Sequence, residues 1–90
     1  MTGKSFQDFM DELYYNPEME FLYCGDRYML SGYVTKNQYT IEVTNIDTSS
    51  TLFKKTGTSR NECVSAFEKA PIFNKKTIYD VEKEIEVLFG

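Results

Sequence analysis

The hydrophobic positions of the chain first follow the spacing of a helix. After Ser5, apolar side chains recur every three or four residues as far as Tyr14. The pattern stops at Asn16 and Pro17, because a proline disfavours helical geometry in the residue before it. The chain is therefore predicted to begin with a helix. Its apolar positions are Phe6, Phe9, Met10, Leu13 and Tyr14.

The hydrophobic period then changes to two residues. Residues 19–24, 27–35 and 38–46 are rich in aromatic and β-branched side chains, a composition typical of strands. The breaks between them, at 25–26 (Gly-Asp) and 36–37 (Lys-Asn), suit two-residue hairpin turns. The sequence therefore predicts three antiparallel strands joined by tight hairpins.

These turns imply a register in which the large apolar residues of the three strands share one face. A slip of one residue would divide them between the two faces. Gly32 lies inward among large side chains in this register, where it would let a helix approach the sheet. The expected cross-strand neighbours are Phe21 with Leu30, Leu30 with Val43, Tyr23 with Tyr28, Gly32 with Ile41, and Val34 with Tyr39.

Two further segments follow the predicted hairpins. Residues 51–56 form a candidate fourth, edge strand, on which Lys54 and Lys55 would discourage pairing with another molecule. After Ser59 a short apolar stripe predicts a second helix, which Pro71 ends.

The last segment, residues 77–90, supports two interpretations. Ile78, Val81, Ile85 and Leu88 recur at helical spacing, and we expect a core-forming helix that covers the apolar face of the sheet. Residues 85–89 also alternate like a strand, which is the alternative. Three helix starts share a hydroxyl residue followed three positions later by an acid: Ser5 with Asp8, Ser59 with Glu62, and Thr77 with Asp80.

These elements define an α+β fold for the whole chain. Ninety residues fit one domain, residues 1–90, with a single core. The predicted order is α-β-β-β-(β)-α-α, a two-layer domain with helices on one face of a three-stranded antiparallel sheet. The sheet has four strands if residues 51–56 are included.

The second face of the predicted sheet carries a candidate protein-binding patch. In the predicted register Leu22 lies there opposite Met29, with Tyr33 two positions along the same face. Phe53 would join them if the loop before it has four residues, and would point inward at another loop length. The patch is either a partner surface or ordinary cross-strand packing.

Acidic residues crowd the last segment. On a helix, Asp80 would lie one turn from Glu84, and Glu82 one turn from Glu86. We interpret these carboxylates as a solvated face, with Glu82 and Glu86 as candidate protein contacts. Metal binding or acid–base catalysis is the remaining alternative, and it would require burial or a pocket.

Composition narrows the possible chemistry. The chain contains no histidine, and its two cysteines, Cys24 and Cys63, are far apart in the sequence. The usual Cys/His zinc sites and the Cys-His and Ser-His nucleophilic pairs are therefore excluded within one chain. We expect buried free thiols rather than a disulfide, no cofactor, and no enzymatic activity.

The chain is expected to lie in the cytoplasm. No apolar run approaches the roughly 20 residues of a membrane span, and the amphipathic, acidic start lacks the apolar block of a signal peptide.

Nucleic-acid binding is the alternative function. The net charge is −4, but residues 51–76 are rich in basic side chains, and the α-β-β-β-α order is superficially that of double-stranded-RNA-binding domains. Against it, four acids follow these lysines and no glycine-rich phosphate loop is present. The candidate contacts are Lys54, Lys55, Arg60, Lys75 and Lys76.

The stretch "NECVSAFEKAPIFNKKTIYDVEKEIEVLFG", residues 61–90, resembles the C-terminal pattern of small uncharacterised α+β proteins of Gram-positive bacteria and their phages. In that group an "API(F)" segment, a lysine and a hydroxyl residue precede an aliphatic stripe. The resemblance implies a fold and no activity. More distantly, the size, acidity and element order are similar to those of phage anti-CRISPR proteins, which occupy DNA-binding sites on RNA-guided nucleases. We therefore expect a non-enzymatic protein-interaction module, such as a small phage or bacterial regulatory or inhibitor protein, whose partner the sequence does not identify.

Overall fold

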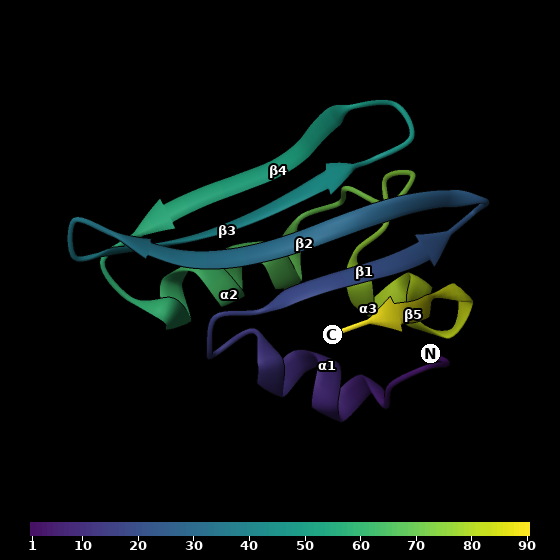
Figure 1. Ribbon diagram of the computed structural model, residues 1–90, viewed down its shortest axis with the longest axis horizontal. Coiled ribbons are helices and arrows are strands. Elements are labelled where there is room, and N and C mark those ends of the chain that lie inside the picture. The colour runs from purple at the N-terminus through teal and green to yellow at the C-terminus, as the bar shows by residue number, and fades with distance from the viewer.

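The computed structural model describes residues 1–90 as one five-stranded antiparallel sheet with three helices against it (Figure 1). The strand order across the sheet is β4-β3-β2-β1-β5. The α+β class and the helices on one face are confirmed, and the sheet gains both the fourth strand and a fifth. The elements are α1 (Phe6–Glu12), β1 (Glu18–Tyr23), β2 (Asp26–Thr35), β3 (Gln38–Asn45), β4 (Ser50–Gly57), α2 (Arg60–Lys69), α3 (Ile78–Val81), a 3-10 turn η1 (Glu82–Glu84) and β5 (Glu86–Phe89).

The first two helices begin where the hydroxyl residues predicted. The Ser5 hydroxyl accepts a hydrogen bond from the Asp8 backbone N–H at 3.1 Å, and the Ser59 hydroxyl accepts one from Glu62 at 3.2 Å. Each bond satisfies a backbone donor that has no partner within the helix.

The β2–β3 register is confirmed, with Leu30 opposite Val43. The predicted β1–β2 register is wrong by two residues, because Phe21 pairs with Tyr28 rather than with Leu30. The turn is Cys24-Gly25, where both residues have positive φ (51° and 84°), as a type I′ hairpin requires. A shift of two keeps every side chain on its predicted face.

The predicted C-terminal helix is wrong beyond Val81. The helix α3 has four residues, and β5 pairs antiparallel with β1 instead. β1 would otherwise leave one edge of unpaired backbone groups beside the core, and a strand satisfies them. Ile85 and Val87 are consequently buried, whereas Leu88 is 41% exposed.

The edge of β5 is itself covered by the start of the chain. The Thr2 backbone N–H donates to the Ile85 carbonyl at 3.0 Å, and the Val87 N–H donates to the Thr2 carbonyl at 2.8 Å. The short strand β5 therefore has partners on both sides.

Eighteen buried hydrophobic residues form the core between the sheet and the helices. Phe9 of α1 packs edge-on against Phe21 at a centroid distance of 6.2 Å, and Phe67 of α2 packs against Phe53 at 5.9 Å. All three helices thus contact the same face of the sheet, as Figure 1 shows. The longest helix, α2, has ten residues, too few to span a membrane.

Tyr39 joins the sheet to the end of α1. Its hydroxyl lies 2.9 Å from the Leu13 carbonyl and 2.7 Å from the Tyr15 carbonyl, and burial raises its pKa, which keeps it protonated as a donor. Gly32 lies beside it. A side chain at Gly32 would meet Pro17 and the Tyr39 hydroxyl, so this glycine admits the loop before β1 rather than the predicted helix.

Both cysteines are free thiols. Cys63 is buried, as expected, and donates to the Tyr39 carbonyl at 3.2 Å. Cys24 is exposed, contrary to the expectation, because it lies in the β1–β2 turn.

Candidate functional site

Because every helix packs on one face, the opposite face of the sheet is uncovered. We call it the open face. The cross-strand pairs place its side chains in rows, such as Ser31 beside Glu42 and Glu42 beside Lys54. Polar and hydrophobic side chains are mixed on this face. Its residues include Glu18, Glu20, Leu22, Arg27, Met29, Ser31, Tyr33, Thr35, Gln38, Thr40, Glu42, Thr44, Thr51, Lys54, Thr56, Glu86 and Phe89.

Four of the six predicted protein contacts lie on the open face. Leu22, Met29 and Tyr33 are half-buried there. Glu86 is directly opposite Leu22 on the neighbouring strand, a proximity that the predicted helix could not have given. The predicted pairing of Leu22 with Met29 is wrong, because Leu22 lies between Arg27 and Glu86 in its cross-strand row.

The other two predicted contacts lie elsewhere. Phe53 pairs with Val43 on the helix-facing side, so the inward alternative is the one that holds. The β3–β4 pairing has an irregularity between Val43 and Thr44, where one extra residue of β4 is inserted. This insertion turns Phe53 to the helix side, whatever the length of the loop before it. Glu82 is held by the Met1 amino group at 3.2 Å and is not part of the open face.

A polar depression of about 320 Å³ lies on the open face, near the β2–β3 hairpin. Thr40 and Thr56 share a hydrogen bond of 2.8 Å there, and no carboxylate lines the depression. The sequence interpretation missed it, because the depression depends on the pairing of β3 with β4. It is lined by Tyr33, Thr35, Lys36, Gln38, Thr40, Lys54 and Thr56.

A second hollow of about 260 Å³ lies beside α1 and is mainly acidic. Lys4 contacts Glu12 across it at 3.4 Å. Asp8 and Asp11 complete its polar lining. Asp8 and Asp11 are exposed, and Lys4 is paired with Glu12, so the hollow is a solvated helix flank.

The five basic residues predicted to contact nucleic acid do not converge. Lys54 lies on the open face, whereas Lys55 is on the helix side, 3.7 Å from Glu62. Arg60 stacks over the Tyr39 ring at 5.2 Å, near one end of the sheet.

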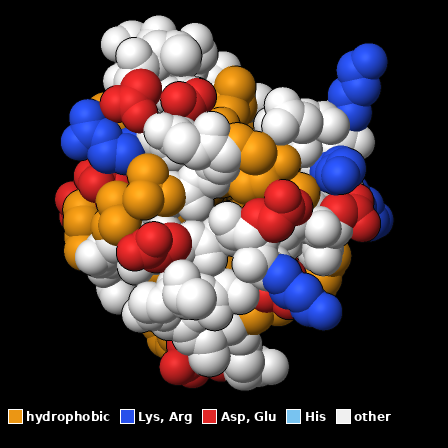
Figure 2. Space-filling view, turned by 90° about the vertical axis from the view of Figure 1, so that its right-hand side faces the viewer, with side chains coloured by type: hydrophobic (Ala, Val, Ile, Leu, Met, Phe, Trp, Pro, Cys, Tyr) orange, Lys and Arg blue, Asp and Glu red, His pale blue; other side chains and the backbone are white.

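Lys75 and Lys76 are in the turn after Phe73, near the opposite end of the sheet. The neighbouring Asn74 amide donates to the Tyr23 hydroxyl at 3.3 Å, at the β1–β2 turn. The two ends are roughly 25 Å apart along β2, at about 3.3 Å per residue. Figure 2 shows the β1–β2 end, where acidic and basic side chains alternate around hydrophobic groups.

The predicted carboxylate pairs of the last segment do not form. The Asp80 carboxylate caps α3, accepting from the Thr77 backbone N–H at 3.0 Å. Glu84 is exposed in the 3-10 turn, and Glu86 lies on the open face. Their separation follows from the early end of the helix. No group of three or more Cys, Asp or Glu side chains is arranged to hold a metal ion.

The buried thiol of Cys63 is a poor nucleophile. Burial raises its pKa, and the neighbouring Glu62 carboxylate raises it further, so the thiol stays protonated near neutral pH. Its role in the structure is as a small core residue and hydrogen-bond donor.

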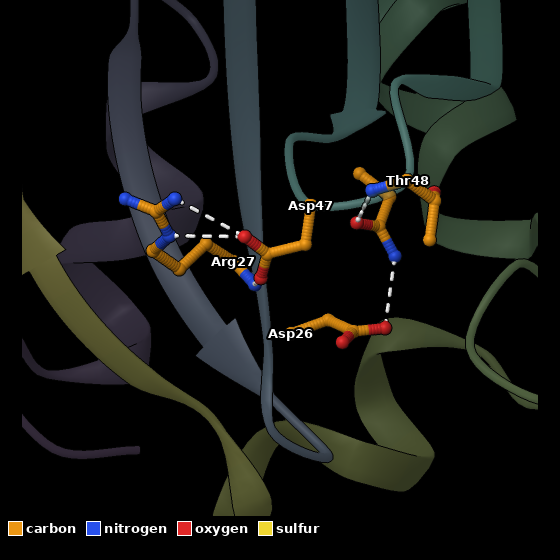
Figure 3. Close-up of polar contacts among 5 residues, drawn as sticks. Asp26, Arg27, Asp47 and Thr48 are labelled. Carbon is orange, nitrogen blue, oxygen red and sulfur yellow. Dashed lines mark hydrogen bonds and ion pairs between the residues drawn. The ribbon is translucent and has the colours of Figure 1, made fainter.

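A polar network lies at the end of the sheet where β2 begins, opposite the polar depression (Figure 3). Asp47 accepts hydrogen bonds from the Arg27 backbone N–H at 2.8 Å and from its guanidinium at 3.1 Å. These bonds hold the pKa of Asp47 below its ordinary value of 3.8. Asn45 donates to Asp26 at 3.1 Å and accepts from Thr48. The network anchors the β3–β4 loop to the start of β2.

Comparison of the chain with protein-family models, with curated proteins and with solved structures gave no match.

Proposed function

We propose that this protein is a non-enzymatic interaction module that binds another protein through its open face. The observation that carries the proposal is a five-stranded sheet with one face free of helices, on which Leu22, Met29 and Tyr33 remain only half-buried. Two-layer α+β domains bury one face of the sheet, and hydrophobic side chains grouped on the other gain most by contact with a partner.

The residue types support protein recognition. Tyrosine and methionine are enriched in the buried centres of interfaces, while charged residues are more common at their rims. Here Glu20 lies between Met29 and Phe89 in one cross-strand row, and Leu22 lies between Arg27 and Glu86 in the next, so each hydrophobic side chain has a charged neighbour.

We place the module in the cytoplasm, because an exposed free thiol such as Cys24 persists most readily in a reducing compartment. A role as a small bacterial or phage regulator or inhibitor rests on the resemblance of residues 61–90 alone. Nucleic-acid binding has less support, since its candidate lysines are spread over both ends and both faces of the sheet.

Affinity purification from the source cells tests the proposal. Tyr33→Ala and Met29→Ala should each reduce recovery of a specific partner at least ten-fold, because truncating a central contact costs about 1–2 kcal/mol or more. Tyr15→Ala is the matched control, since Tyr15 is 67% exposed and lies beyond α1 on the helix side. A partner retained by both open-face variants and lost by the control would refute the proposal.

A further inference from the structure

The two edges of the sheet differ in one respect. β5 is four residues long, and its outer edge is covered by the backbone of Thr2. β4 is eight residues long, pairs with β3 alone, and has no backbone hydrogen bond to any other segment along its outer edge. It spans about 26 Å at 3.3 Å per residue. An extended chain could therefore pair with β4 over most of its length.

Charge indicates what kind of chain would fit. β4 carries Lys54 and Lys55 and no acid, and Lys36 projects from the adjacent hairpin. Lys55 has a carboxylate partner, Glu62, at 3.7 Å. Lys36 and Lys54 have none within ion-pair distance, although Glu42 lies opposite Lys54 on β3. Both line the polar depression beside β4, which contains no acid.

The same charges disfavour a second copy of this chain as the occupant. Two antiparallel copies of β4 paired with Lys54 opposite Lys54, a register that keeps both open faces on the same side, would bring two ammonium groups directly opposite each other. Like charges on neighbouring strands are destabilising. A chain with acidic side chains would instead meet unpaired ammonium groups.

We propose that the outer edge of β4 binds an extended acidic segment of another protein, which adds to the sheet as a sixth strand. Alternate side chains of that segment face the open side, where a glutamate beside Lys54 or Thr56 reaches the depression lined by Lys36 and Lys54. The backbone of β4 supplies affinity, and the lysines supply selectivity for acidic residues. The inference rests on the proposed function and names the chemistry of its partner.

Fluorescence anisotropy with two labelled decapeptides tests the charge requirement. One alternates glutamate with valine and threonine, and the other has lysine in place of glutamate. The glutamate peptide should bind at least ten-fold more tightly, and binding should weaken with salt. In Lys36→Glu/Lys54→Glu the preference should reverse, whereas Lys69→Glu, at the far end of α2, should leave it unchanged.

Backbone methylation tests strand addition itself. Two versions of the glutamate peptide carry N-methyl groups on alternate residues, one version on the odd and one on the even positions. Because only alternate N–H groups of an edge strand face its neighbour, one version should lose at least ten-fold in affinity and the other should bind like the parent. Equal binding of both versions, no binding of either unmethylated peptide, or a stable dimer of the protein in sedimentation would overturn the proposal.

The result separates this inference from the proposed function. If Tyr33→Ala and Met29→Ala release a cellular partner while the peptides show no preference, the open face is the interface and β4 is not.

Discussion

At the scale of single residues, Gly32 shows how close backbone approach constrains this fold. An added Cβ would lie 2.5 Å from Pro17 Cδ and 2.5 Å from the Tyr39 hydroxyl. Neither neighbour can move freely, because the proline is a ring and the hydroxyl is bound to two carbonyls. The position therefore tolerates only glycine, despite the general advantage of alanine in strands.

We predict that Gly32→Ala lowers the free energy of unfolding by about 1–3 kcal/mol, the range for overpacked sites. Urea denaturation measures the change. Ser31→Ala, one position earlier on the open face, is the control and should stay within about 0.5 kcal/mol of the parent. A Gly32→Ala variant as stable as the parent would show that the loop at Pro17 moves away easily.

Asp47 makes the folding stability of the protein depend on pH in the acidic range. Its pKa is lower in the folded state than its ordinary value of 3.8, so its stabilising contribution is present above that value and is lost as the pH falls through the folded pKa. Asp47→Asn removes the charge but keeps an acceptor for the Arg27 N–H.

We therefore expect Asp47→Asn to melt below the parent at pH 7, with the difference narrowing as the pH falls below about 4. Thermal melts from pH 7 to pH 3 measure this. A difference that is constant over the whole range would mean that the charge of Asp47 contributes nothing to stability.

At the scale of elements, the sequence predicted the type of element correctly wherever a single hydrophobic period, that of a helix or that of a strand, dominated. The first helix, β2 and β3 followed from clear periodicity, and the β2–β3 register followed from the shared face of the apolar residues rather than from the Lys36-Asn37 turn. The β1–β2 register was wrong because Gly25 suits two turn positions, and the sequence does not say which it occupies. The last segment was wrong because Ile85 and Leu88 fit a helix as well as Ile85 and Val87 fit a strand.

The choice between helix and strand is made by the pairing of β5 with β1. The local sequence pattern gives no information about that pairing. Ile85→Ala should therefore lower stability by about 2–5 kcal/mol, a large part of the ~5–13 kcal/mol expected for 90 residues. Leu88→Ala should cost about 1 kcal/mol or less, because that side chain is 41% exposed. Equal losses, measured by thermal or urea unfolding, would instead favour the continuous helix.

At the scale of the whole molecule, the α+β class and the side of the sheet that the helices cover were predictable, because they depend on which residues share a face. The positions of Leu22, Met29 and Tyr33 on the open face followed from the same reasoning. The polar depression and the contrast between the two edges were not predictable. They depend on how β3 meets β4 and on Thr2 pairing with β5, which are contacts between distant segments.

The central claim is that the open face is the surface that meets another protein. Photo-cross-linking in the source cells tests it most directly, with p-benzoylphenylalanine in place of Tyr33 on the open face or Tyr15 on the helix side, since the aromatic replacements are matched. The account predicts a discrete protein adduct from position 33 and none from position 15. Adducts from position 15 alone, or no protein adduct from position 33, would contradict it.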